Sequence, residues 1–445
     1  MKKKIIYLSV ILVLVISVIT LSSIYKSKDN KYKKEYNTIP KEMAIMIKEE
    51  GATDYTKSTS KDIPIGNYVL NEEKTYCENN GKVTNYDSTT GTVSINFIGS
   101  DRCYLYFDYY FEPKGYEKIL LDNGNGATTV DEAKAYIEGK GIPDFSTAAT
   151  TNEGLFKADD DYTAITGMKS YYFRGAVDNN WVKFGKDSTG KDIYWRIIRI
   201  NGDGSIRMIY TGTTAPTEST KVVMTGTGTH ISTSAFNSSH NNPSYVGYMY
   251  TASQQHGNST SSTIKTTLEN WYKTTTLETD SATKALVSQD QIFCNDRSVT
   301  SGIWSSSTST TTYYAAYTRL FTSKSPILTC PTESDKFTSK NSSIGNKALD
   351  YPVGLITADE VAMAGGKYQT SNSSYYLYTK QVYWSGSPRN FDGYSAYANE
   401  FLVYSSGTLN DTDVDYAYGA RPVVSLSSKA KLSGSGTYND VYTVS

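Results

Sequence analysis

Cysteine and histidine are scarce in this chain of 445 residues, which contains four Cys and three His. No Cys-x-x-Cys pair is present, and His230, His240 and His256 follow no metal-ligand spacing. Isolated histidines in a Thr- and Ser-rich segment are ordinary loop residues in most proteins. We therefore expect neither a metal site nor a cofactor.

Catalytic motifs are missing as well. The sequence has no Gly-x-Ser-x-Gly elbow, no His-Glu-x-x-His and no phosphate-binding loop. Two carboxylates could still meet in a cleft as the acids of a glycosidase, but nothing in the sequence selects a pair. We expect a protein that is not an enzyme, and a cryptic glycan-active enzyme stays open as an alternative.

The chain also lacks an excess of positive charge. Lys and Arg number 44 against 45 Asp and Glu, which gives a net charge of −1. Removing Lys2, Lys3 and Lys4 at the N-terminus leaves 41 basic residues against the same 45 acidic ones. Proteins that bind nucleic acid need a basic surface that displaces counter-ions from phosphates. Nucleic acid is therefore excluded from the expected partners.

One apolar run stands out near the N-terminus. Residues 5–24 follow "MKKK" and carry no charge. Twenty residues in a helix span about 30 Å, which is the thickness of a bilayer core. Lysines before such a segment favour a cytoplasmic N-terminus. We expect a single-pass protein of the cell membrane with an extracellular body, and a cleaved signal peptide with a secreted body is the rival interpretation.

The four cysteines lie in the part of the chain that we expect to be exported. An even, small number of Cys outside the cell is typical of disulfides, and the local pairing is Cys77–Cys103 with Cys294–Cys330. Another connectivity, or four unpaired thiols, remains the alternative. A bridge between Cys77 and Cys103 would stabilise a β module that is too small for a large core.

Composition and turn signals divide the chain into five parts. They are a membrane anchor or signal segment at 1–24, a stalk at 25–61, a small β module at 62–125, a helical linker at 126–159 and a main domain at 160–445. Within the stalk, Pro40 and Gly51 favour a short helix between them.

Several elements can be predicted in the later parts. "NGDG" at 201–204 predicts a hairpin between 192–200 and 205–212. Capping-box spacing predicts helices after Thr129 and after Thr357, and apolar periodicity predicts another helix over 261–277. Strand-like stretches close the chain at 382–388, 399–411 and 419–426.

The order of these motifs resembles a known group. "YWRIIRI", "SSTIKTTLENWYKTTTL", "ALVSQDQIF", "GLITADEVAMAGG", "VYWSGSP" and "YGARPVVSL" follow one another as in an uncharacterised bacterial surface and phage-associated family of C-type-lectin-like, formylglycine-generating-enzyme-like domains. The matching residues are Thr357, Glu360, Trp384, Ser385, Gly419, Arg421 and Pro422.

The resemblance implies an α+β fold. A C-type-lectin-like head with small antiparallel sheets, one or two helices and long loops would follow the disulfide-stapled β module and the N-terminal transmembrane helix. The chain departs from members with known activity, because no Cys follows Cys330 and the enzyme's active-site pair is absent. The motif of calcium-dependent sugar-binding lectins is also absent.

Tyrosine is abundant, with 39 copies against 13 Phe. Tyr and Asn offer large contact area and adaptable hydrogen bonds, as in antibody paratopes. We interpret "YWSGSP" (383–388) as framework and the "RNFDGYSAYAN" that follows (389–399) as an exposed loop. The predicted ligand-binding residues are Arg389, Asn390, Phe391, Asp392, Tyr394, Tyr397, Asn399, Tyr404, Asn410, Asp411, Asp413, Asp415, Tyr416 and Tyr418.

These observations favour an extracellular, membrane-anchored ligand-binding or adhesion protein of a bacterium. Its partner would be an extracellular protein or a glycan. A structural envelope component without a diffusible ligand is the main alternative.

Overall fold

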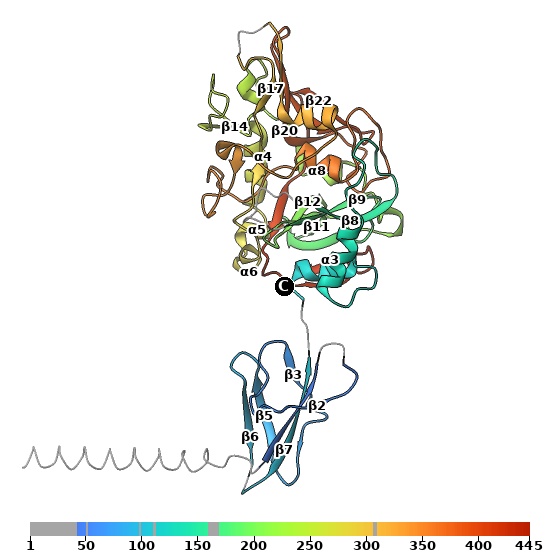
Figure 1. The fold of residues 1–445 in the computed structure, drawn as a ribbon. Helices are drawn as coiled ribbons and strands as arrows, with labels where there is room; N and C mark the ends of the chain where they lie inside the picture. The colour runs from blue at the N-terminus through green and yellow to red at the C-terminus, as the bar shows by residue number, and fades with distance from the viewer. Residues whose placement is uncertain (1–41, 50–51, 98, 110–112, 159–168, 306–308) are drawn as a thin grey trace, which may run out of the picture. The chain divides into compact units, whose positions relative to one another are not determined.

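The computed structural model describes residues 42–49, 52–97, 99–109, 113–158, 169–305 and 309–445 (Figure 1). The predicted membrane segment at 5–24 lies outside these ranges. Within them, no helix combines the length and apolar character needed to cross a membrane. The chain divides into two compact units, Met1–Glu112 and Pro113–Ser445. Strand content of 34% against 17% helix makes the protein a mixed α and β structure built on small sheets.

The first unit is a small β structure. Its larger sheet has the order β2-β1-β7-β3, with β4 also paired to β7, and β5 with β6 forms a separate hairpin. The strands are β1 (Glu42–Lys48), β2 (Thr56–Lys57), β3 (Tyr68–Leu70), β4 (Tyr76–Cys77), β5 (Lys82–Asp87), β6 (Thr92–Asn96) and β7 (Arg102–Tyr109).

The short helix predicted between Pro40 and Gly51 is wrong, because β1 runs through this stretch and pairs in parallel with β7. Met43, Ile45 and Ile47 recur at every second position, and Ile45 lies in the core of this unit. This period of two is the pattern of a strand, and the sequence interpretation missed it because Pro40 and Gly51 look like the ends of a helix.

A disulfide joins Cys77 to Cys103 across the neighbouring strands β4 and β7, as predicted. Cys103 lies with Leu105 and Phe107 in the buried core of the first unit. The second predicted bridge, Cys294–Cys330, is also present, and no described cysteine is free.

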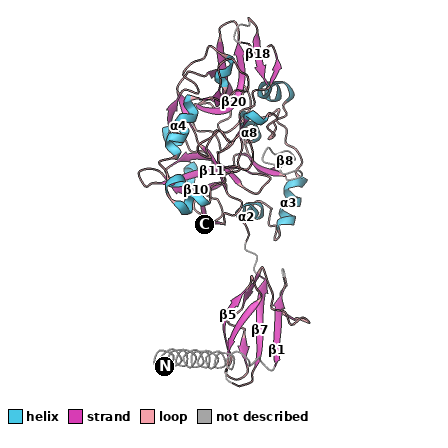
Figure 2. Ribbon diagram, turned by 90° about the vertical axis from the view of Figure 1, so that its left-hand side faces the viewer, coloured by secondary structure: helices cyan, strands magenta, loops and turns pink. Residues whose placement is uncertain are grey.

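The second unit contains two larger sheets. The eight-stranded sheet has the order β24-β12-β11-β10-β26-β25, with β9 paired to β11 and to β8. The seven-stranded sheet has the order β13-β23-β20-β18-β17, with β21 paired to β20 and to β22. Figure 2 shows both sheets with the short helices around them.

The strands of the eight-stranded sheet are β8 (Asn152–Ala158), β9 (Ser170–Gly175), β10 (Trp181–Lys186), β11 (Asp192–Ile200), β12 (Ile206–Gly212), β24 (Val423–Leu426), β25 (Leu432–Ser433) and β26 (Tyr442–Val444). Those of the seven-stranded sheet are β13 (Ser232–Ser234), β17 (Val299–Ser301), β18 (Thr311–Tyr314), β20 (Tyr383–Asp392), β21 (Tyr397–Val403), β22 (Leu409–Asp413) and β23 (Tyr418–Ala420). Two small pairs are β14 (Met249–Tyr250) with β15 (Thr260–Ser261), and β16 (Phe293–Cys294) with β19 (Lys336–Phe337).

The helices of this unit are short. They are α2 (Gly115–Asp122), α3 (Val130–Gly139), α4 (Thr263–Tyr272), α5 (Thr276–Thr279), α6 (Ser281–Ala285), α7 (Ala315–Tyr317) and α8 (Ala358–Met363). The predicted capping boxes are confirmed, since Thr129 caps α3 and Thr357 caps α8. The helix predicted over 261–277 is present as α4 followed by α5. The hairpin predicted around 201–204 is β11 paired with β12.

Helices α2 and α3 belong to the core of the second unit. Ile119 and Leu120 of α2, and Ala133 and Ile137 of α3, are buried in the same hydrophobic cluster as the residues of the eight-stranded sheet. Strand β8 pairs with β9 at the margin of that sheet. The unit therefore begins at Pro113 and includes much of the segment read from sequence as a helical linker.

Helix α8 lies between the two large sheets of this unit (Figure 1). Glu360 is fully buried there, and its carboxylate lies 3.0 Å from Nε of Arg199 and 2.6 Å from Nε of Arg207. Both arginines come from the eight-stranded sheet. The capped helix is thereby fixed to β11 and β12 by a buried ionic contact.

Candidate functional site

The predicted binding segment forms a β-hairpin. Strand β20 continues to Asp392 and β21 starts at Tyr397, so the exposed loop predicted over 389–399 is wrong apart from its turn. Pro388 does not end the strand, because the register shifts on both sides of it absorb its missing N–H. The sequence did not predict that this strand continues past Pro388, because Gly386, Pro388 and the serines beside them interrupt the apolar alternation that marks a strand.

The inner face of the hairpin packs into the core. Phe391, Ala398 and Leu402 are completely buried, so Phe391 is not available to a ligand. Glu400 lies on this face too and is fully buried, and neither of its carboxylate oxygens has a hydrogen-bond partner. Burial raises the pKa of Glu400 well above its ordinary value.

The opposite face gathers several of the predicted binding residues. Strand pairing places Asn390, Asn399 and Asp413 in one row across β20, β21 and β22, and Asp392 with Tyr397 in the next row. Side chains opposite each other in such pairs point to the same side of the sheet, with Cβ atoms about 5 Å apart. We call this surface the polar face; its residues are Tyr313, Asn390, Asp392, Tyr397, Asn399, Asp411 and Asp413.

An aromatic cluster borders the polar face around Arg389. The guanidinium carbon lies 4.7 Å from the ring centroid of Tyr317 and 5.3 Å from that of Tyr313. Nη2 of Arg389 donates to the Tyr368 hydroxyl at 3.2 Å, and that hydroxyl donates to Asp411 at 3.0 Å. This cation is therefore already held by rings and a carboxylate of its own chain.

The sequence interpretation overlooked Tyr313, Tyr317, Phe321 and Tyr368. The first three form a stacked series, with ring centroids 4.5 Å and then 5.1 Å apart. Their spacing of four residues in "YYAAYTRLF" is a helical signal that could have grouped them. Tyr368 lies far from them in sequence, and no local pattern connects it to the cluster.

His240, which the sequence interpretation took for an ordinary loop residue, also borders the polar face. Its Nδ1 lies 2.6 Å from Oδ2 of Asp415, and its ring centroid lies 4.7 Å from that of Tyr397. Both members of the His240–Asp415 pair are about one third exposed. The His240–Asp415 pair thus forms a second edge of the polar face, beside the exposed ring of Tyr397.

Negative charge dominates the polar face. Burial raises the pKa of Asp413, and Asp415, Asp411 and Asp392 raise it further, while His240 opposes them. Among the described residues the Asp413 carboxylate accepts no hydrogen bond and forms no ion pair, and only the backbone oxygen of Asp413 accepts a bond, from the N–H of Tyr416. Its carboxylate is therefore open to a group that comes from outside the chain.

The other predicted residues lie elsewhere. Tyr394 stands at the hairpin turn and is 76% exposed, and Tyr416 is 53% exposed. Tyr416 stacks against Tyr418, which packs on the buried Trp384. Tyr404 is half-buried, and Asn410 lies opposite Leu402 on the other side of β22 from Asp411 and Asp413. These residues do not join the polar face.

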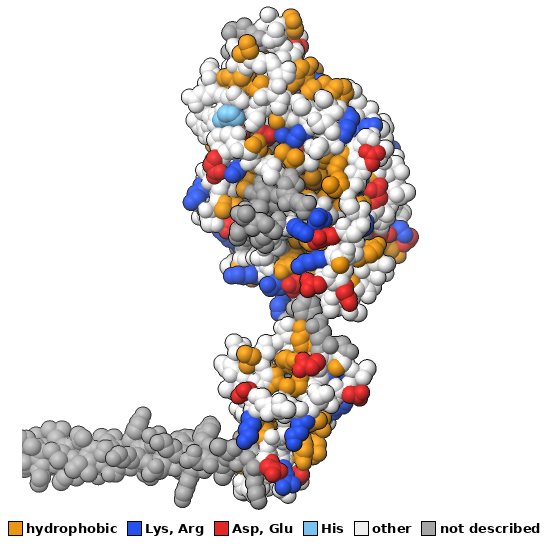
Figure 3. All heavy atoms as spheres, in the orientation of Figure 1, with side chains coloured by type: hydrophobic (Ala, Val, Ile, Leu, Met, Phe, Trp, Pro, Cys, Tyr) orange, Lys and Arg blue, Asp and Glu red, His pale blue; other side chains and the backbone are white. Residues whose placement is uncertain are grey.

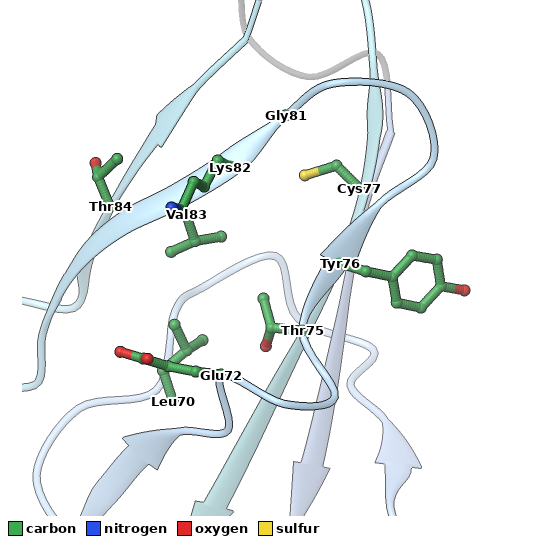
Figure 4. Close-up of a pocket in the computed structure, with 9 residues that line it drawn as sticks. All are labelled: Leu70, Glu72, Thr75, Tyr76, Cys77, Gly81, Lys82, Val83 and Thr84. Atoms are coloured by element: carbon green, nitrogen blue, oxygen red, sulfur yellow. The ribbon is translucent and has the colours of Figure 1, made fainter.

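Two cavities in the described residues are separate from this surface. One of about 490 Å³ in the first unit is bordered by Leu70, Cys77 and Val83, and Figure 4 shows Tyr76 directed away from it. Another of about 380 Å³ in the second unit is bordered by Tyr116, Tyr171 and Asn201. The part of the chain that the structure describes holds no group of three or more acidic, His or Cys side chains suited to a metal ion.

The surface charge of the second unit is mixed. On the side shown in Figure 3, the basic and acidic side chains of the described residues are interspersed and form no extended patch of one sign. The comparisons with family models, with curated proteins and with solved structures find no match for this chain.

Proposed function

We propose that this protein is an extracellular, membrane-anchored ligand-binding or adhesion protein of a bacterium, and that the polar face and the adjoining hairpin turn form its binding surface. The observation that carries the proposal is the row Asn390–Asn399–Asp413 on one sheet face. A sheet face that packs inside a protein is normally apolar, whereas this one combines the buried amides of Asn390 and Asn399 with carboxylates and exposed tyrosines, and the buried Phe401 is the apolar residue on the same side of β21.

The arrangement has the character of a recognition surface. Tyr394 and Tyr397 offer aromatic area in the open, and the strands beneath them hold their backbone in place. Rigid tyrosines surrounded by polar side chains are typical of interface hot spots, because they bury much area at a low cost in side-chain entropy. We further propose that the second unit has the C-type-lectin-like fold that its motif order resembles.

The location is part of the same proposal. Residues 5–24 would anchor the chain, and the two disulfides suit an oxidising compartment outside the cell. Protease added to intact cells should then digest the second unit. Protection of that unit until the cells are lysed would overturn the proposed topology.

The binding surface can be tested with full-length protein in a polyoxyethylene detergent, on arrays of glycans and extracellular proteins. The double variant Tyr394→Ala/Tyr397→Ala should lose at least tenfold in affinity for any ligand found. Tyr136→Ala is the matched control, because this tyrosine is 45% exposed on α3 and lies outside the surface. Equal binding by wild type and the double variant would reject the surface, and concentration-dependent self-association instead of ligand binding would favour a structural envelope role.

A further inference from the structure

The polar face carries acceptors that lack donors. Oδ1 of Asn390 is buried without a hydrogen-bond partner, and the residue as a whole is 3% exposed. Its strand partners are Tyr313 on one side and Asn399 on the other, so the amide lies on the polar face. A buried acceptor without a donor destabilises the folded protein, and a donor from a bound ligand would remove that cost.

The neighbouring groups are acceptors as well. Asn399 donates from Nδ2 to the backbone oxygen of Tyr397, and its Oδ1 accepts no hydrogen bond from the described residues. Asp413, its strand partner, is the unpaired carboxylate of the row. Two amide oxygens and a carboxylate therefore follow one another across three strands.

The charge of the surroundings is negative. Asp392, Asp411 and Asp415 all act on Asp413, whereas Arg389 is held by Asp411 and Tyr368, and His240 by Asp415. An anionic ligand would meet repulsion, and a neutral sugar would leave the carboxylate of Asp413 without a counter-charge. The set of groups matches a ligand with several N–H donors and a positive charge.

Aromatic rings complete the set. Tyr397 stands in the row next to Asn399 and Asp413 and is 37% exposed. The electron-rich face of such a ring attracts a cation. The border of the polar face already contains such a contact, because the guanidinium of Arg389 lies against the rings of Tyr313 and Tyr317.

We infer that the ligand of the polar face is a protein that presents an arginine or lysine side chain, whose cationic group binds over Asn399 between Tyr397 and Asp413. A guanidinium suits the row particularly well, since its planar fork can donate to a carboxylate and an amide oxygen at once and can stack on a ring. The inference rests on the proposed function and adds the chemical class of the ligand.

Saturation-transfer NMR with full-length protein in a polyoxyethylene detergent can test the inference. The probes are N-acetyl-arginine amide and N-acetyl-lysine amide, with N-acetyl-citrulline amide as the uncharged equivalent of arginine. Glucosamine and N-acetylglucosamine form a second pair that reports on amino sugars. We expect signals from the arginine and lysine probes at least fivefold stronger than from citrulline.

The variants are Asp413→Asn and Asn390→Ala, with Asp131→Asn as the control because this exposed aspartate on α3 undergoes the same change of charge. Asp413→Asn should reduce the arginine signal at least fivefold, and Asn390→Ala should reduce it by a smaller factor. Tryptophan fluorescence verifies folding, because all five Trp lie in the second unit. For Asp413→Asn, removal of a partly buried carboxylate should not unfold the protein.

Equal signals from arginine and citrulline, or an unchanged arginine signal in Asp413→Asn, would overturn the inference. A signal from glucosamine alone would assign the site to an amino sugar and would also overturn it. These results are independent of the array experiment, where the double tyrosine variant decides whether the surface binds a ligand at all.

Discussion

The guanidinium carbon of Arg389 lies 4.7 Å from the ring centroid of Tyr317. This contact joins β20 to α7, two elements that are 72 positions apart at these residues. It also fixes the arginine that borders the polar face, because Asp411 and Tyr368 hold the other side of the same group. The carboxylate of Asp413 on this face therefore stays unpaired, because Arg389 is already held by other groups.

Replacing Arg389 by Lys should lower the free energy of unfolding of the second unit by about 1–2 kcal/mol. Lysine keeps the charge, but it cannot stack on Tyr317 as a planar group and reach Tyr368 and Asp411 together. Urea unfolding followed by tryptophan fluorescence measures the change. An unchanged midpoint would mean that the stacked geometry contributes nothing to stability.

Glu400→Gln should stabilise the second unit at neutral pH. Burial raises the pKa of Glu400, so the folded state holds a proton that the unfolded chain releases above about pH 4.5. The stability linked to this proton is complete below the unfolded pKa and is lost as pH rises toward the folded pKa. The variant has no proton to lose, so the difference in its free energy of unfolding from wild type should grow as pH rises above 4.5 and vanish below it.

The matched control is Glu333→Gln, because Glu333 is exposed and forms only a surface ion pair with Lys336. Such pairs contribute less than about 1 kcal/mol. The difference in the free energy of unfolding between Glu333→Gln and wild type should stay small across the same pH range. If Glu400→Gln behaves like this control, the buried carboxylate is satisfied in solution by a group that stabilises its charged form.

Local signals in the sequence predicted the elements that depend on local chemistry. The turn "NGDG" and the capping threonines Thr129 and Thr357 act within four residues, so β11–β12, α3 and α8 could be placed before the structure was known. The disulfide pairing also followed from proximity in the sequence. The strand β1 was missed although its apolar residues alternate, because Pro40 and Gly51 were read as the ends of a helix.

The candidate site could be predicted only in part. Asn390, Asn399 and Asp413 were chosen for their residue types, but their row depends on the register of three strands, which no composition encodes. Phe391 sits one position from Asn390 and points into the core, since adjacent residues of a strand face opposite sides. His240 and Tyr368 come from distant segments and join the surface through tertiary packing alone.

Glu360→Gln should destabilise the second unit by about 3–5 kcal/mol, since it leaves the buried cations of Arg199 and Arg207 without their counter-charge. Burial on its own raises the pKa of Glu360, but Arg207 and Arg199 outweigh it and the pKa lies below its ordinary value of 4.5. The stability from this carboxylate is therefore present above pH 4.5 and lost as pH falls below it. The difference in urea midpoint between variant and wild type should be larger at pH 7 than at pH 3, and an equal difference at both pH values would contradict the ionic account.

Removing the Cys294–Cys330 bridge as Cys294→Ala/Cys330→Ala should lower the stability of the second unit by up to about 4 kcal/mol, because the bridge closes a loop with a sequence separation of 36. Cys77→Ala/Cys103→Ala is the paired control, since that bridge belongs to the first unit. Tryptophan fluorescence reports on the second unit only, so the first variant should shift the urea transition and the control should not. A shift in both would show that the two units unfold as one cooperative structure.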